Sequence, residues 1–288
     1  MPQPETPYDN SPIEALPPLR ELVAALDMRA RKSLGQNFLF DLNLTRRIAG
    51  SAGKLGGTTI EVGPGPGGLT RALLLEGAEH VIAVEKDFRA GAVLGSLIDA
   101  ANGRLELIEA DALKTNLWDF GSAPRRIVAN LPYNIATSLL IQWLEHASAF
   151  DSLTLMFQRE VAQRITAQPG DSNFGRLSIL TGWIADSAIL FDIPPEAFVP
   201  APKVTSSVVQ IRPLAQPRYP CARKALETVT RLAFSQRRKM LRASLKPLGG
   251  EALLNRVGID PESRPQELDI EAFCVLARAI EEQGSVGL

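Results

Sequence analysis

Short apolar stretches alternate with helical patterns from residue 58 to residue 211. Seven stretches have the length and the Val, Ile and Leu content of strands: 58–62, 80–85, 105–109, 126–129, 152–157, 187–191 and 206–211. Apolar residues at helical spacing fill most of the gaps, notably 68–76, 137–146 and 159–167. This alternation predicts a doubly wound α/β fold with a mostly parallel, seven-stranded sheet covered on both faces. The last two strands are expected to form an antiparallel edge pair.

The two ends of the chain follow other patterns. Residues 1–18 contain six prolines and little apolar periodicity, so we expect a mobile or loosely docked arm, followed by a helix over 19–30. After Pro213 the strand signal stops, and 222–245, 251–257 and 270–283 have helical spacing. The sequence therefore predicts a Pro-rich arm (1–18), an α/β domain (19–213) and a small all-helical domain (214–288).

Composition excludes several classes of protein. Hydrophobic residues make up 45% of the 288 residues and charged residues 22%, which is ordinary for a folded globular chain. Every apolar run is too short for a membrane span, and the N-terminus has no signal-peptide pattern. Two cysteines and two histidines do not suffice for a conventional zinc site, so we expect no metal. The expected location is the reducing cytoplasm.

A glycine-rich loop follows the first strand and opens a helix. Gly63, Gly65 and Gly68 have the G-x-G-x-x-G spacing of dinucleotide-binding proteins, so the loop alone leaves the ligand open. Two prolines between these glycines remove N–H donors that a pyrophosphate would need. Glu61, just before the loop, would repel a pyrophosphate but would suit a cationic ligand that carries an amino group and a sulfonium.

Two further carboxylates stand at the ends of the next strands. Glu85 could accept both hydroxyls of a ribose, and Asp111 could accept the exocyclic amine of an adenine. Taken singly, each also fits a solvated loop residue. Together with Glu61 they would line one crevice at the carboxyl edge of the sheet. This pattern favours S-adenosylmethionine over a dinucleotide as cofactor.

The fourth strand runs into Asn130-Leu131-Pro132-Tyr133. The Asn130 carbonyl, with a backbone carbonyl at Leu131 or Pro132, could accept both N–H bonds of an adenine amine and free its lone pair for attack on a methyl sulfonium. Tyr133 offers a face on which an extruded base can stack. Seen alone, the tetrapeptide would also fit a turn with a packed tyrosine. Its position after the glycine loop and the carboxylates favours methyl transfer to an adenine N6.

The chain resembles the S-adenosylmethionine-dependent rRNA adenine N6-dimethyltransferases, from about residue 29 onward. The resemblance rests on the glycine loop, Glu85, Asp111, Asn130-Leu131-Pro132-Tyr133, and four further motifs: Leu34-Gly35-Gln36-Asn37-Phe38-Leu39, Met156-Phe157-Gln158-Arg159-Glu160-Val161, Pro202-Lys203-Val204 with Ser206, and Phe234-Ser235-Gln236-Arg237-Arg238-Lys239. Within this group, the chain most resembles the bacterial family that modifies two adjacent adenosines near the 3′ end of 16S rRNA. It implies the Rossmann-like class I methyltransferase fold.

The resemblance also implies residue roles. Asn37 and Leu39 would touch the cofactor, Gly63 its amino-acid end, Glu85 its ribose and Asp111 its adenine. Asn130 would contact both cofactor and target amine, and Tyr133 would stack on the target base. From its pattern alone, Asn37 also fits a turn or cap residue.

Basic residues gather late in the chain. Residues 197–260 hold twelve basic and three acidic residues, a net charge of +9, although the whole chain has −1. Within the expected helix 222–245 and just after it, Arg238 and Arg242, and Arg242 and Lys246, are spaced for one face. A solvated amphipathic helix would show the same pattern. We expect contacts to RNA phosphates from the following residues: Arg29, Arg31, Lys32, Lys203, Arg237, Arg238, Lys239, Arg242 and Lys246.

The expected function is therefore N6,N6-dimethylation of two adjacent adenosines of 16S rRNA, within the small subunit or its precursor, coupled to late subunit maturation, by a cytoplasmic monomer. Three alternatives stay open. They are a large-subunit rRNA adenine dimethyltransferase, a non-catalytic ribosome-assembly protein on the same fold, and an NAD-dependent oxidoreductase.

Overall fold

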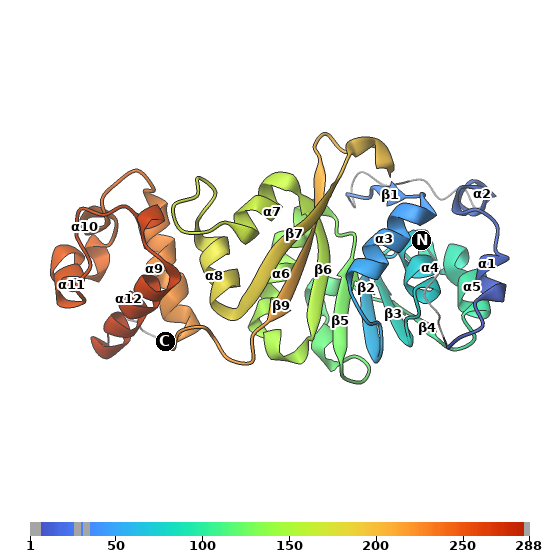
Figure 1. Cartoon of the computed structure of the whole chain (residues 1–288), viewed down its shortest axis with the longest axis horizontal. Helices are drawn as coiled ribbons and strands as arrows, with labels where there is room; N and C mark the ends of the chain where they lie inside the picture. The colour runs from blue at the N-terminus through green and yellow to red at the C-terminus, as the bar shows by residue number, and fades with distance from the viewer. Residues whose placement is uncertain (1–6, 26–29, 31–34, 285–288) are drawn as a thin grey trace. The chain divides into compact units, whose positions relative to one another are not determined.

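The main structural feature of the chain is a mixed seven-stranded sheet (Figure 1). The computed structural model describes residues 7–25, 30 and 35–284. The sheet order is β4-β3-β2-β5-β6-β9-β7. The strands are β2 (Thr58–Val62), β3 (His80–Glu85), β4 (Leu105–Glu109), β5 (Arg125–Ala129), β6 (Ser152–Gln158), β7 (Ala185–Ile193) and β9 (Ser206–Pro213). The first five in this list pair in parallel, β9 is antiparallel to β6, and β7 is the edge strand.

All seven predicted strands are present, and the predicted doubly wound α/β class is confirmed. Two short strands, β1 (Phe38–Leu39) and β8 (Phe198–Val199), were not predicted; they pair with each other in a separate antiparallel sheet. Two-residue strands carry no periodicity that a sequence pattern could show.

Helices cover both faces of the sheet. The helical segments between the N-terminus and β6 are α1 (Ser11–Glu14), α2 (Leu19–Ala25), α3 (Leu42–Ser51), α4 (Gly68–Leu75), α5 (Ala90–Ala100), α6 (Tyr133–Glu145) and the 3₁₀ turns η2 (Ala112–Lys114), η3 (Leu117–Asp119) and η4 (Ala147–Ala149). In Figure 1, α3 and α4 lie in front of the sheet and α6 lies behind it. The carboxylate of Asp41 starts α3 by accepting the amides of Asn43 and Leu44.

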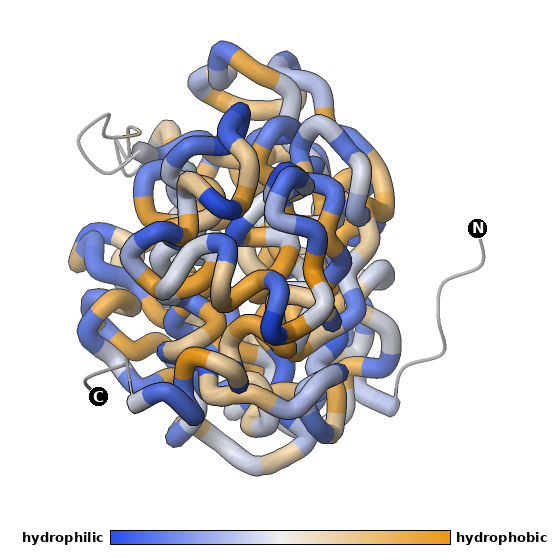
Figure 2. Tube along the Cα trace, turned by 90° about the vertical axis from the view of Figure 1, so that its left-hand side faces the viewer, coloured by the Kyte–Doolittle hydropathy of each residue, from blue (hydrophilic) through white to orange (hydrophobic). Residues whose placement is uncertain are grey.

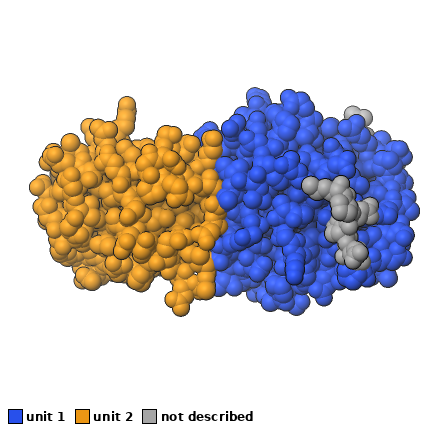
Figure 3. Space-filling view, viewed as in Figure 1, with its two compact units in different colours: residues 1–162, 188–213 blue, residues 163–187, 214–288 orange. Residues whose placement is uncertain are grey.

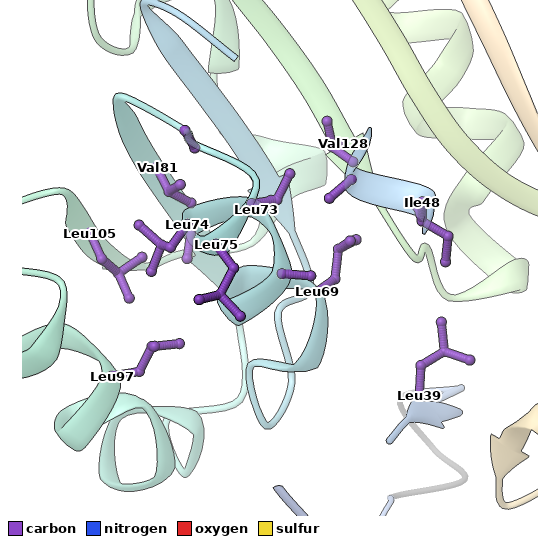
Figure 4. Packing of buried hydrophobic residues seen from close by; sticks show 14 of the residues in the cluster. Leu39, Ile48, Leu69, Leu73, Leu74, Leu75, Val81, Leu97, Leu105 and Val128 are labelled. Atoms are coloured by element: carbon purple, nitrogen blue, oxygen red, sulfur yellow. The ribbon is translucent and has the colours of Figure 1, made fainter. Parts of the chain in front are cut away.

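One apolar core fixes the α4 side of the sheet. Leu69 and Leu73 of α4 meet Val81 of β3 and Val128 of β5 (Figure 4). Every residue of β2 is buried, as expected for a strand inside a parallel sheet with helices on both faces. Short orange and blue stretches alternate along the tube in Figure 2, which is typical of amphipathic elements. This packing holds the carboxyl ends of β2, β3 and β5 in fixed register.

The second part of the chain is mainly helical. It contains α9 (Arg223–Ser235), α10 (Leu241–Ser244), η6 (Lys246–Leu248), α11 (Gly250–Arg256), η7 (Pro265–Glu267) and α12 (Ile270–Glu282); α7 (Arg159–Thr166), α8 (Arg176–Ile184) and η5 (Pro195–Ala197) precede it. None of the helices in the described ranges is long and apolar enough to cross a membrane.

The chain divides into two compact units (Figure 3). One holds residues 1–162 and 188–213, and the other holds 163–187 and 214–288. The last stretch of the second unit begins at residue 214, and this unit also includes residues 163–187, which were expected within the α/β domain. There Phe174 packs edge-to-face on Phe234, which also meets Phe273, and the Trp183 indole donates to the Tyr219 carbonyl. The role predicted for each unit stays a prediction.

The continuous helix predicted over 222–245 is wrong. Helix α9 ends at Ser235, residues 236–239 form a turn, and α10 starts anew at Leu241. The break is stabilised because the amides of Leu241 and Arg242 donate to the carbonyls of Ser263 and Pro261 instead of to an extended α9. Arg238, Arg242 and Lys246 therefore do not share one helical face.

The arm was expected to be mobile or loosely docked, and its described residues, 7–18, are docked on α4; residues 1–6 lie outside the described ranges. The Arg71 guanidinium of α4 donates to four carbonyls of this segment, those of Ile13, Glu14, Leu16 and Pro17. The Ile13 side chain is fully buried. The sequence could not predict these hydrogen bonds, because their acceptors are backbone carbonyls, which any residue supplies.

We expect Arg71→Ala to release the docked segment. Loss of four charge-assisted hydrogen bonds should lower the free energy of unfolding by about 2 kcal/mol and accelerate amide exchange over 10–17. Hydrogen exchange with mass analysis measures both, with Arg212→Ala, an exposed arginine of β9, as the matched control. Unchanged exchange over 10–17 would refute the docking described above.

Candidate functional site

A cleft of about 200 Å³ opens at the carboxyl ends of the parallel strands. Its walls come from the glycine loop after β2, the end of β3, the turn after β4, the motif after β5, and residues 35–39. All eight predicted cofactor-binding residues line it: Asn37, Leu39, Glu61, Gly63, Gly65, Glu85, Asp111 and Asn130. Residues far apart in the sequence thus meet where open α/β sheets bind their ligands.

Close packing explains the glycines of the loop. Gly65 has a φ of +52°, and a Cβ there would lie 2.9 Å from the Phe38 ring. A Cβ on Gly68 would lie 2.5 Å from the Leu39 carbonyl oxygen. The amide of Gly63 donates to the Val84 carbonyl (2.9 Å), which ties the loop to β3. The glycine loop and the segment 35–39 therefore pack so closely that side chains at Gly65 and Gly68 would clash.

Glu61 is the most perturbed carboxyl group of the cleft. Its side chain is 1% exposed, and its Oε2 has no hydrogen-bond partner among the described residues. The pKa of Glu61 is raised to about 8, chiefly by burial; the Thr70 hydroxyl opposes this rise, and the Glu85 carboxylate adds to it. An unpartnered carboxyl oxygen beside a cleft is suited to a cationic group such as an ammonium.

Glu85 is held rigidly at the end of β3. Its Oε1 accepts the amides of Lys86 and Asp87, both at 2.8 Å, and its Oε2 accepts the Gly65 amide at 3.2 Å. Burial raises the pKa of Glu85, while these backbone donors lower it. A carboxylate accepts about four hydrogen bonds, so capacity for a ligand hydroxyl remains on Oε2.

Asp111 follows β4 and carries an ion pair that the sequence analysis missed. The Lys86 ammonium lies 2.9 Å from Oδ2 of Asp111, and the Leu113 amide donates to Oδ1. The Lys86 hydrogen bond is the main cause that lowers the pKa of Asp111. Lys86 also lines the cleft, so one end of the cleft holds an ionised carboxylate with its counter-charge. The signal in the sequence was only a lysine next to Glu85.

Asn130 is half-buried and its orientation is fixed. Its Nδ2 donates to the Asn37 carbonyl at 3.0 Å, so its Oδ1 is the atom left to accept a hydrogen bond in the cleft. The side-chain amide of Asn37 donates to the Gly35 carbonyl, which is the turn role that its pattern alone allowed. Asn37 thus contributes its backbone carbonyl to Asn130 while its side chain stabilises the turn.

Of the two backbone carbonyls predicted as acceptors for the target amine, those of Leu131 and Pro132, one is already occupied. The Pro132 carbonyl accepts the amides of Ile135 and Ala136, both at 3.1 Å, at the start of α6. The Leu131 carbonyl is therefore the backbone candidate. The side chain of Leu131 is buried.

Tyr133 begins α6 but is not among the residues that line the cleft. Its hydroxyl lies 2.5 Å from Oγ of Ser206, the first residue of β9. Burial raises the pKa of Tyr133, so its hydroxyl stays protonated. Its predicted stacking on a target base stays a prediction.

Gln36 and Ser206 have structural partners that the sequence analysis did not name. The Gln36 amide reaches Oδ2 of Asp87 at 3.3 Å, which connects the segment 35–39 to the end of β3. Asp87 is held ionised, with a pKa of about 2, chiefly by its hydrogen bonds to Arg89. Gln36 and Ser206 both lie within motifs that carry the resemblance, but their partners are distant in sequence.

The structure separates the predicted RNA contacts. Arg29, Arg31 and Lys32 lie outside the described residues. Arg237 donates to the Ser172 carbonyl at 2.6 Å, and Arg242 lies 3.6 Å from Glu262. The remaining four are exposed without a described ion pair: Lys203, Arg238, Lys239 and Lys246. In the described ranges, no cluster of three His, Cys, Asp or Glu side chains could hold a metal ion.

The sheet order and the cleft at its carboxyl edge define a class I methyltransferase that uses S-adenosylmethionine. Comparison with known proteins narrows this class: residues 27–282 match the family of ribosomal RNA adenine dimethylases. The chain belongs to that family. It is a ribosomal RNA adenine dimethyltransferase dependent on S-adenosylmethionine.

Similar proteins agree with this assignment. The chain is 55% identical over 278 residues to "Ribosomal RNA small subunit methyltransferase A" of Rhodospirillum rubrum, which covers 96% of each chain. It is 56% identical to the protein of that name from Azorhizobium caulinodans, over 93% of this chain and 94% of the relative.

Two solved structures share the fold. A dimethyladenosine transferase from Plasmodium falciparum has a TM-score of 0.75 at 26% identity, covering 86% of this chain and 98% of that one. The 23S rRNA methyltransferase ErmE has a TM-score of 0.64 at 26% identity, covering 85% of this chain and 100% of that one.

The buried carboxyl of Glu61 predicts a pH-dependent stability. Unfolded, it ionises around 4.5; folded, it keeps its proton up to about 8, so the unfolded state binds fewer protons between these values and stability falls as pH rises. We expect Glu61→Gln to remove this fall. The difference in Tm between variant and wild type should therefore grow from pH 5 to pH 9. Glu106→Gln, an exposed carboxyl of β4, corrects for loss of a charge, and a constant difference would contradict the prediction.

Proposed function

We propose that this protein dimethylates the N6 amines of two adjacent adenosines near the 3′ end of 16S rRNA, within the small ribosomal subunit or its precursor, as a step of late subunit maturation. The single observation that carries the chemistry is the fixed amide of Asn130 in the cleft. The choice of the small subunit is supported by the relatives at 55–56% identity, which are named as small-subunit rRNA methyltransferases. Ribosomal subunits are met in the cytoplasm, which we propose as the location, and we propose a monomer.

The carboxyl groups of the cleft match the ammonium, hydroxyl and amine groups of the cofactor. Glu61 offers an unpartnered carboxyl oxygen to an ammonium, Glu85 accepts ribose hydroxyls, and Asp111 accepts the adenine amine. Gly63 lets the backbone approach the amino-acid end, and residues 35–39 cover the cleft. When bound, S-adenosylmethionine supplies a methyl group on a sulfonium, which a nucleophile can attack.

The protein's part is to prepare the nucleophile. Oδ1 of Asn130 and the Leu131 carbonyl each accept one N–H of the target amine, which draws its lone pair out of conjugation with the ring. Pro132 fixes the backbone between the acceptors and α6. Tyr133 stacks on the base and holds it out of the RNA. No strong base is required, because the methylated amine loses its proton readily to water.

A methylation assay on the two ribosomal subunits distinguishes the proposed function from the large-subunit alternative. Purified protein and labelled S-adenosylmethionine are incubated with immature small subunits and, separately, with large subunits. Digested RNA is then analysed by mass. Dimethyladenosine in the small subunit alone supports the proposal, and label in the large subunit alone refutes it.

In the same assay we expect Asn130→Ala to lower the rate of methyl transfer at least about 100-fold, because one of the two acceptors for the amine is lost. Its Tm should stay close to that of wild type. Asn116→Ala is the matched control, since Asn116 is exposed and its side chain makes no capping hydrogen bond. A loss smaller than tenfold would refute the mechanism.

The turn 236–239 is the proposed RNA contact of the helical unit. We expect Arg238→Glu with Lys239→Glu to weaken binding to the small subunit and to reduce the slope of log affinity against log salt by about 1 to 2, because each phosphate contact contributes slightly less than one. Cofactor affinity should not change. Lys54→Glu with Arg212→Glu is the control, because both residues are exposed and stand next to the amino ends of β2 and β6. An unchanged slope would argue against the contact.

A further inference from the structure

A buried serine holds the tyrosine of the catalytic motif. The Tyr133 hydroxyl and Oγ of Ser206 lie 2.5 Å apart, and Ser206 is fully buried. The two residues are 73 positions apart in sequence. This contact therefore joins the motif after β5 to the antiparallel strand β9.

The position of Ser206 is fixed by the sheet. It pairs with Gln158, the last residue of β6, and β6 is the neighbour of β5. The amide of Arg159, the first residue of α7, donates to the Thr205 carbonyl at 2.9 Å. Ser206 thus lies at the same edge of the sheet as Asn130, on backbone that has little freedom to move.

Tyr133 is held at both ends. Its backbone begins α6 directly after Pro132, and its hydroxyl is bound by Ser206. A tyrosine ring has two side-chain torsions, so fixing its far end leaves the ring a single orientation. The ring is only half-buried, so part of its surface stays open to a ligand.

We propose that Ser206 is a positioning residue for methyl transfer: by binding the Tyr133 hydroxyl it orients the ring on which the target adenine stacks. This inference rests on the proposed function of Tyr133. Ser206 does not touch the reacting atoms. It acts by reducing the number of ring orientations, and so increases the fraction of bound adenines whose amine meets Asn130.

A double-mutant cycle tests this role. Tyr133→Phe removes the hydroxyl and keeps the ring, Ser206→Ala removes its partner, and the third variant carries both changes. Each is assayed in single-turnover methyl transfer on the RNA that the wild type methylates, with Tm and the Kd for S-adenosylmethionine measured alongside.

We expect each single change to slow methyl transfer on the order of tenfold, and the double variant to be no slower than either, because both remove the same interaction. The Kd for S-adenosylmethionine should stay within twofold. Tyr133→Ala, which removes the ring itself, should be slower than all three.

Ser207 provides the matched control. It is also fully buried, and its hydroxyl donates to Oδ1 of Asp192 at 2.6 Å rather than to the tyrosine. Ser207→Ala should lower Tm by an amount similar to Ser206→Ala and leave the methyl-transfer rate within twofold of wild type.

Two outcomes would overturn the inference. One is a rate within twofold of wild type for Tyr133→Phe or Ser206→Ala, with or without a lower Tm. The other is an equal loss of rate for Ser207→Ala, which would show a general effect of damage to β9. Wild-type methylation of the large subunit instead of the small one would refute the proposed function, and the cycle would still be decided on that RNA.

Discussion

The hydrogen bond from the Asn130 amide to the Asn37 carbonyl is the contact on which the site depends. It joins the segment that covers the cleft to the end of a central strand of the sheet. It also decides which end of the Asn130 amide is available, because an amide whose nitrogen is bound presents its oxygen. One interaction thus fixes both a wall of the cleft and the proposed acceptor for the target amine. A cleft without residues 35–39 in place would lose both.

The carboxyl groups in and near the cleft differ in the direction of their pKa shifts, and each shift has a physical cause. Glu61 and Glu85 are buried, which raises the pKa of each, whereas hydrogen bonds from Arg89 and Lys86 lower the pKa values of Asp87 and Asp111. The glycine-loop end can therefore take up a cation by losing a proton, while the β4 end is already an anion with a partner. A dinucleotide would bring negative charge to the glycine loop, where the carboxyl groups of Glu61 and Glu85 offer it no favourable partner.

The parts of this architecture that repeat were predictable, and the parts that depend on single long-range contacts were not. Strands such as 58–62 are predicted by their apolar sequence. Glu85, Asp111 and Asn130 are predicted as site residues because they stand at strand ends. The break after Ser235 was hidden, because its donors are satisfied by carbonyls of residues 261 and 263. The contacts that dock the arm had no signal in the sequence either, since Arg71 binds backbone oxygens. Lys86 and Ser206 carried no periodic signal at all.

The motif after β5 shows how backbone and side chain divide the work. The Pro132 carbonyl accepts two amides of the first turn of α6, so it stabilises the helix, and the proposed acceptor roles are left to Asn130 and Leu131. Pro132 itself has no N–H to satisfy, which suits a residue at the boundary between strand and helix. The helix that begins at Tyr133 then directs the tyrosine towards β9, where Ser206 can reach it. Each residue of the tetrapeptide therefore has its own place: Asn130 is held by Asn37, Leu131 is buried, Pro132 joins strand and helix, and the Tyr133 hydroxyl is bound at its far end.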